Sequence, residues 1–229
     1  MARDDVHIVR HTALPPIPDA VPSQSVLNRM GMQIVVDFFD QMVLSGFAYH
    51  MQAGTENAGI NSTEVIDDVL VWMIADNATG KAMIPLLYEC TPGVIGAATL
   101  VMALLEVDKA KLRYSSGGTT YVPANLRGDD PNGANGVFKI IAGAGIVALA
   151  KTAVPDSVEL ARKDFIENAL TDTLGYPGAW DTEIYSIRRK AMCIITDASS
   201  IVGHFGAASA DVVGYGVLQF AQLDKAQVT

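Results

Sequence analysis

Gly143 and Gly145 have the spacing in this chain that comes closest to a cofactor site. Together with Ala148 they match the G-x-G-x-x-A form of a dinucleotide fingerprint, and Asp164 follows at about the distance of a ribose contact. In such a fold the glycines permit a tight turn and let a pyrophosphate approach a helix N-terminus. Only the short run 137–141 precedes this motif, and its flanks lack the alternation of strands and helices that a parallel sheet requires. We therefore predict a strand packed with small residues here.

The histidines and paired acids are the other groups with chemical potential, as metal ligands. His7 and His11 are four residues apart, but the prolines that follow disfavour a helix that would bring them together. His50 and His204 lie in strand-like runs, and we expect them to face a sheet surface or an interface. Residues 129–135, DDPNGAN, offer oxygen ligands for a structural cation, with a solvated turn as the alternative. The chain has no HExxH, CxxC or GxSxG motif, so we predict no enzyme activity, no catalytic residue, no metal site and no cofactor.

Composition indicates a folded domain that associates with other chains. Half of the 229 residues are hydrophobic and only 18% are charged, which excludes intrinsic disorder. That apolar share is high for a soluble monomer and favours a homo-oligomer or a larger assembly. The net charge is −9 and the lysines and arginines are scattered, so we predict no direct binding of nucleic acid. Cys90 and Cys193 lie in strand-like segments, and we expect both to be buried free thiols.

Residues 1–25 are predicted to form an extended N-terminal arm. Four prolines between residues 15 and 22 preclude a regular helix and favour polyproline-like geometry. Such an arm can lie along a neighbouring subunit or remain a free terminus, and the sequence leaves both readings open. The segment lacks the apolar core of a signal peptide. The longest uncharged stretch, residues 90–105, is too short to span a bilayer, so no membrane span is expected.

After the arm, the sequence predicts mainly short strands separated by turns. The strand-like runs are residues 33–39, 41–49, 64–75, 82–91, 98–107, 137–150 and 183–196. Gly46 is expected to mark a bulge or kink, residues 54–62 a loop, and residues 76–80 a turn. Such spacing of strands and turns is typical of a sandwich, a jelly roll or a barrel.

Three further segments complete the predicted order of elements. Apolar residues recur at helical spacing over residues 158–174, which predicts the one helix. Residues 114–136 are polar and rich in glycine, and a loop of this length is typical of a functional or interfacial segment. Residues 199–223 consist of two uncharged runs around a small polar turn at residues 209–211, and we predict that they form a hairpin that closes a sheet.

Two stretches resemble parts of viral capsid subunits. Residues 114–127, YSSGGTTYVPANLR, resemble a loop that recurs in capsid subunits of bacteriophages and archaeal viruses, and residues 199–223 are similar to the closing strands of their jelly rolls. The proline-rich arm also suits a capsid protein. The nearest group is the small single-jelly-roll major capsid proteins of tailless, membrane-containing icosahedral viruses, the sphaerolipovirus-like group.

This resemblance implies an all-β fold, with a single jelly roll over residues 26–229, the extended arm before it and one short helix inserted between strands. It implies a structural protein of the virion that self-assembles into capsomers of an icosahedral shell. The partners would be copies of itself and other capsid proteins, and the arm would tie neighbours together or face an internal viral membrane. Two alternatives remain: a β-sandwich module for host attachment or carbohydrate binding, and a nucleotide-binding oxidoreductase that uses Gly143 and Gly145.

Overall fold

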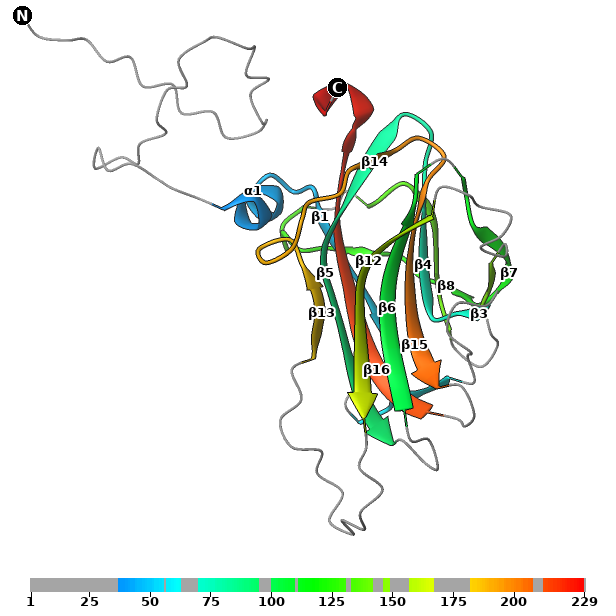
Figure 1. Cartoon of the computed structure of the whole chain (residues 1–229). Helices are drawn as coiled ribbons and strands as arrows, with labels where there is room; N and C mark the ends of the chain where they lie inside the picture. The colour runs from blue at the N-terminus through cyan, green and yellow to red at the C-terminus, as the bar shows by residue number, and fades with distance from the viewer. Residues whose placement is uncertain are drawn as a thin grey trace, which may run out of the picture.

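The protein is an all-β sandwich, as predicted (Figure 1). The computed structural model describes residues 37–55, 57–62, 70–94, 100–109, 111–130, 133–141, 146–148, 157–166, 182–207 and 212–228. The predicted arm with His7 and His11, its boundary at residue 25, and the fingerprint glycines Gly143 and Gly145 lie outside these residues. No helix in the described ranges combines the length and the apolar character needed to cross a membrane.

Two large antiparallel sheets face each other across the core. The first has the order β13 (Glu183–Ser186), β5 (Lys81–Val94), β16 (Val212–Asp224), β1 (Ala48–Ala53) and β9 (Ala124–Asn125), while β14 (Ile195–Thr196) also pairs with β5 and β2 (Ile60–Ser62) with β16. The second has the order β12 (Ser157–Ile166), β6 (Leu100–Asp108), β15 (Ser200–Ala207), β4 (Met73–Asn77), β10 (Gly136–Ile140) and β8 (Thr119–Thr120).

Three smaller units cover parts of this sandwich. A third sheet consists of β3 (Leu70–Val71), β11 (Ile146–Ala148) and β7 (Tyr114–Gly117). Its Val71 and Ile146 pack in one apolar cluster with Ile74 and Val202, so it covers part of the outer face of the second sheet. A short helix, α1 (Phe38–Leu44), precedes β1, and a 3₁₀ turn, η2 (Lys225–Gln227), follows β16.

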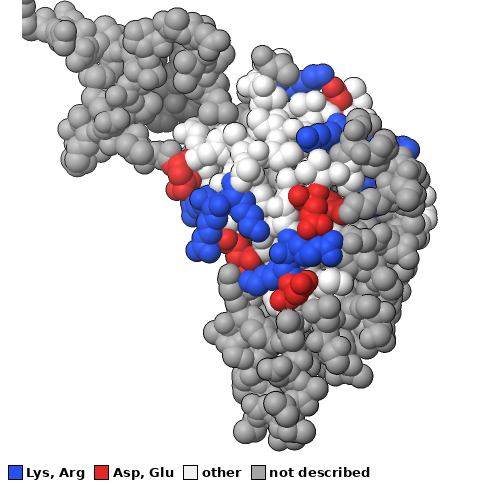
Figure 2. Space-filling model, in the orientation of Figure 1, with Lys and Arg blue, Asp and Glu red and all other residues white. Residues whose placement is uncertain are grey.

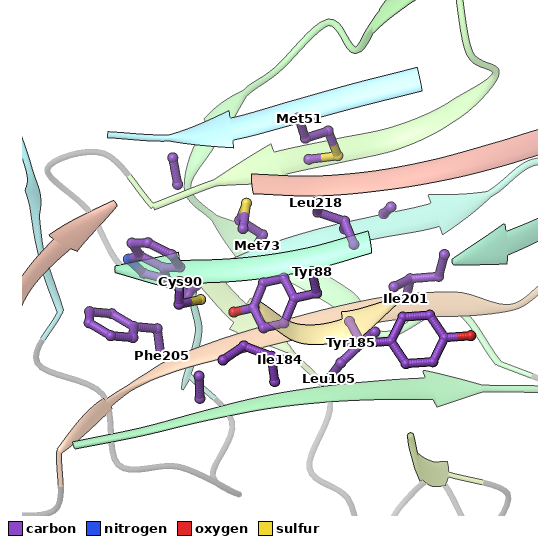
Figure 3. Close-up of a cluster of buried hydrophobic side chains, with 14 of the residues drawn as sticks. Met51, Met73, Tyr88, Cys90, Leu105, Ile184, Tyr185, Ile201, Phe205 and Leu218 are labelled. Carbon is purple, nitrogen blue, oxygen red and sulfur yellow. The ribbon is translucent and has the colours of Figure 1, made fainter. Parts of the chain in front are cut away.

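The core fills the space between the two large sheets (Figure 3). Strand β16 shows how the sequence builds it, because residues alternate between buried and half-exposed from Val212 to Gln219. The first sheet contributes Met51, Tyr88, Cys90 and Leu218 to this core, and the second contributes Met73, Leu105, Ile201 and Phe205. The ring of Trp72 lies against that of Phe205, with their centroids 4.8 Å apart. The interior of the sandwich is therefore occupied by side chains.

The first two predicted strands are wrong over residues 38–44, which form α1. Asp37 begins the helix by accepting a hydrogen bond from the Asp40 backbone N–H at 2.8 Å. The apolar residues of this helix pack against Ile84, Leu86, Ala221 and Leu223 on the outer face of the first sheet. Gly46 is not a bulge in a strand; it has a φ of 75° just after the helix, where a left-handed residue commonly ends a helix.

The predicted helix at residues 158–174 is also wrong where the structure describes it. Residues 157–166 form β12, which pairs antiparallel with β6 along its whole length. Ala161 and Phe165 are both buried, and a spacing of four residues suits a strand face with a period of two as well as a helix. A bulge between Glu159 and Ala161 shifts the alternation, so the residues before it lose the strand pattern. Residues 167–174 lie outside the described part.

The predicted terminal hairpin is wrong in its pairing. Both runs are strands, but β15 lies in the second sheet between β6 and β4, whereas β16 lies in the first sheet between β5 and β1. Each is flanked on both sides by other strands, so neither can pair with the other. The chain therefore crosses from one sheet to the other between residues 207 and 212.

The other predicted elements are confirmed in part: residues 60–62 of the predicted loop 54–62 form β2, and the predicted run 183–196 is strand only at β13 and β14. The predicted turn at residues 76–80 is confirmed for residues 78–80, which join β4 to β5 with Gly80 at a φ of 80°, whereas Asp76 and Asn77 are the last residues of β4. Strand β5 runs further than predicted, through Pro92 and Gly93 to Val94, and β6 matches the predicted run 98–107 closely. The segment 114–136, predicted as a long loop, instead contains the short strands β7, β8 and β9.

Candidate functional site

Among the residues that the sequence singled out for metal binding, those that the structure describes do not converge. Within the described ranges, no group of three His, Cys, Asp or Glu side chains is placed to hold a metal ion. Asp129 instead pairs with Arg127, whose Nε lies 2.8 Å from Asp129 Oδ1, and this hydrogen bond lowers the pKa of the carboxyl. His50 is half-buried on the face of β1 opposite the core, and His204 is buried on β15.

Both cysteines are free thiols. Cys90 is buried in the core, as expected, and burial raises its pKa. Cys193 is only half-buried, so the expectation of a buried thiol is wrong for this residue, although desolvation still raises its pKa. Because the thiolate is the reactive form, these shifts make both side chains poor nucleophiles.

A cluster of charged side chains is buried on the outer face of the second sheet. Arg113 Nη1 lies 3.1 Å from Glu106 Oε2 and 3.3 Å from Asp108 Oδ2, and each of these side chains is at most 1% exposed. His204 Nε2 lies 3.7 Å from the same Glu106 oxygen. Charges at this depth persist only when they are paired, so Arg113 is the group that holds two carboxylates under the protein surface.

Asp76 extends this ionic cluster to the neighbouring strand. Its Oδ1 accepts a hydrogen bond from Ser200 Oγ at 2.6 Å, and its Oδ2 accepts one from the Tyr114 backbone N–H at 3.1 Å. Burial raises the pKa of Asp76 and of Asp108 in spite of these favourable contacts. The cluster therefore fixes the segment before β7 to the second sheet.

Sequence reasoning missed this cluster, although one signal was present. Glu106 and Asp108 are two residues apart at the end of a long uncharged run, which places both on one face of β6. Two acids on one face of a strand with an otherwise apolar sequence indicate either an exposed strand end or a buried partner cation. Only the structure identifies that cation as Arg113.

The raised pKa of Asp76 predicts a specific pH dependence. A carboxyl whose folded pKa lies above its unfolded value of 3.8 contributes its full stability below that value and loses it as pH rises through the folded pKa. We therefore compare the free energies of unfolding of the wild type and of D76N. The wild-type value minus the D76N value should be greater at acidic pH than at neutral pH. Urea titrations of both proteins at the two pH values measure this difference, and a constant difference would contradict the prediction.

The outer face of the first sheet offers a candidate association surface. Val213, Tyr215 and Val217 are half-exposed on the central strand β16. Val217 is paired with Glu89 of β5 on one side and with Gln52 of β1 on the other. We call this surface the outer β16 face; it comprises His50, Gln52, Leu87, Glu89, Thr91, Val213, Tyr215, Val217 and Gln219, all half-exposed.

The edge of the sandwich carries charges of both signs. Arg162 forms a salt bridge with Glu159 on β12, and after β13 Arg189 approaches Glu183 at 3.4 Å. Arg188 binds Asp37 and Asp40 of the α1 region. Figure 2 shows cations and carboxylates beside one another over this face. Isolated pairs at this exposure add little stability, but charges along an edge strand discourage unspecific pairing with other chains.

No protein-family model matches this chain, and neither a curated protein nor a solved structure matches it. Function is therefore inferred from the strand order, the packed core and the outer β16 face.

Proposed function

We propose that the protein is a structural capsid subunit with a jelly-roll fold, which self-assembles into capsomers of an icosahedral virion. Its partners in this proposal are copies of itself and other capsid proteins. The sequence resemblance over residues 114–127 and 199–223 suggested this class, and three structural observations support it.

The strand order is the observation that carries the proposal. The eight main strands in chain order are β1, β4, β5, β6, β12, β13, β15 and β16. Numbered one to eight, they give the sheet orders 6-3-8-1 and 5-4-7-2. Two Greek keys in two sheets with this order are what we expect of a jelly roll, a fold that viral capsid proteins, lectins and cupins share, and the strand order therefore supports the proposal.

The packed interior favours a structural role among proteins of this fold. Barrels that bind a ligand inside keep a cavity between their sheets. Here aromatic rings fill that space, since Phe220 stacks between Tyr49 and Phe138 at centroid distances of 5.8 and 5.5 Å. The surfaces of the sandwich are therefore the parts available for function.

The outer β16 face suits association with a second copy of the chain. Its centre is apolar, with Glu89 on the β5 side and His50 and Gln52 on the β1 side. A two-fold axis along β16 would place the β5 side of one copy over the β1 side of the other. Each Glu89 carboxylate would then lie near the partner's imidazole or amide donor, so the face is complementary to itself.

The mass of the purified full-length chain in solution tests this proposal. We expect light scattering to give species heavier than the 24.3 kDa monomer, and negative-stain microscopy of the same sample to show regular capsomers. V217K should raise the concentration needed for assembly at least about tenfold, or about 1.4 kcal/mol, because it places a charge at the centre of the interface.

V137K is the matched control, because Val137 is an exposed valine on β10 of the other sheet. It should assemble like the wild type. A wild-type chain that stays monomeric at every concentration would contradict self-assembly. Equal assembly of V217K and V137K would exclude the outer β16 face as the interface.

A further inference from the structure

A polar pocket with a volume of about 400 Å³ lies at the end of the sandwich where β5 begins and β16 ends. Small-molecule sites commonly occupy about 300–1,000 Å³. The pocket is lined by the segment after α1, by Tyr49 of β1, by the start of β5, by the end of β16 and by Arg127, Asp130, Gly133 and Asn135. It borders the packed core at Tyr49 and is not part of the outer β16 face.

The floor of the pocket is fixed by buried amide groups. The Gln222 side chain is only 5% exposed, and its Nε2 donates to Asn77 Oδ1 at 3.0 Å and to the Asn135 carbonyl at 2.6 Å. Its Oε1 accepts from the Asn135 N–H at 2.6 Å. A floor held by bonds from β4, β16 and the loop needs little ordering when a ligand binds.

The walls of the pocket place donors beside acceptors. Lys81 Nζ lies 2.6 Å from Asp224 Oδ1, and both residues line the pocket. Arg127 and Asp130 line it as well, so cations and carboxylates are equal in number in the lining. A hydroxyl group both donates and accepts hydrogen bonds, and such a mixture of charged partners can bind several hydroxyls at once.

Aromatic side chains supply the apolar part of the lining. Phe47 and Tyr49 both reach the pocket. A tyrosine phenol is protonated at neutral pH and can donate a hydrogen bond, and burial, together with the nearby Asp130 charge, raises the pKa of Tyr49 further from that range. Polar walls with an aromatic patch match a ring that carries hydroxyl groups on its edges and C–H groups on its faces.

We propose that this pocket binds a neutral polyhydroxylated ligand, a monosaccharide unit of a glycan. A neutral ligand is favoured because an anion would have to displace carboxylates from the two cations: Asp224 from Lys81, and Asp129 from Arg127, whose Nε lies 2.8 Å from Asp129 Oδ1. A fully apolar ligand would leave those charges without solvent. A surface subunit with such a pocket would bind glycans in addition to forming a shell.

Saturation-transfer NMR on the full-length protein tests this inference with four probes: glucose, galactose, mannose and N-acetylglucosamine. We expect transfer to at least one of them, with a dissociation constant of about 1 mM or lower. Glycine serves as a zwitterionic probe, and inorganic phosphate, which has no observable proton and is followed by ³¹P line broadening, as an anionic one. Transfer to none of the four sugars, or binding of glycine or phosphate in preference to them, would overturn the proposal.

Two glycines of one loop offer a matched pair of variants. A Cβ at Gly133 or at Gly128 would meet no atom within 4 Å, but only Gly133 lines the pocket. G133L should weaken sugar binding at least about tenfold by filling the pocket, whereas G128L should bind like the wild type. Equal binding by both variants would place the sugar elsewhere and overturn the assignment, whether or not the protein forms capsomers.

Discussion

Replacing Arg113 by methionine is expected to lower the free energy of unfolding by about 3–5 kcal/mol. The side chain is 1% exposed and contacts the carboxylates of Glu106 and Asp108, which are equally buried. Without the guanidinium, two carboxylates would lie side by side in a medium that solvates them poorly. Within the described residues, Asp108 Oδ1 already lacks a hydrogen-bond partner, so little would stabilise the charge of Asp108 once the guanidinium is removed. Since domains are stable by only about 5–15 kcal/mol, the variant should be close to its unfolding limit.

Urea unfolding at neutral pH measures this loss, and R162M provides the control. Arg162 pairs with Glu159 on the exposed edge, 2.9 Å apart, where an ion pair is worth about 0–1 kcal/mol. Adding E106Q and D108N to R113M should recover part of the loss, because the uncompensated charges are its main source. If R113M unfolds at the same urea concentration as R162M, the ionic cluster does not stabilise the fold.

Individual strands could be predicted where local pattern and packing agree. Residues 82–91 and 98–107 are rich in apolar side chains, and the strands that they contain, β5 and β6, lie inside their sheets and are buried by the opposite sheet. The turn between β4 and β5 is indicated by Gly80, which has the positive φ that such a turn requires, although Asp76 and Asn77, which are also predicted in the turn, end strand β4.

Pairing and periodicity could not be predicted from the same kind of pattern. Adjacent strands with a short link normally pair, yet β15 and β16 join different sheets because β6 and β5 are their partners. Those partners lie about a hundred residues earlier, so no local signal reports them. The four-residue spacing of Ala161 and Phe165 fits both a helix and a strand. Strict alternation of apolar and polar residues would have indicated the strand, but the bulge between Glu159 and Ala161 interrupts that alternation.

The two polar sites illustrate the same limit. The pocket collects Lys81, Arg127, Asp130, Gln222 and Asp224 from three distant segments, and none of these segments contains a recognisable motif. The sequence drew attention to the loop at residues 129–135 as a cation site. The structure instead places Asp130, Gly133 and Asn135 in the lining of the pocket and pairs Asp129 with Arg127.

Replacing Gly216 by alanine is expected to destabilise the fold by about 1–3 kcal/mol, because it overpacks the junction between the sheets. Gly216 lies at the centre of β16, and a Cβ there would be 2.5 Å from Trp72 Cζ3 and 2.6 Å from the Glu89 carbonyl oxygen. The indole could turn away only by leaving Phe205, and the carbonyl belongs to β5, which pairs with β16. The absent side chain therefore lets Trp72 pack directly on the backbone of the first sheet.

G128A is the matched control for G216A, since a Cβ at Gly128 would meet no atom within 4 Å. Its unfolding free energy should stay the same or rise by up to about 1 kcal/mol, because alanine restricts the unfolded chain. Combining G216A with W72F separates the two clashes: the smaller ring relieves the contact with Trp72 but leaves the one with the Glu89 oxygen, so we expect partial recovery relative to W72F alone. If the free energy of unfolding of G216A equals that of G128A, the sheets can move apart at Gly216 without loss of stability. The close contact of Trp72 with β16 would then have no role in holding the two sheets together.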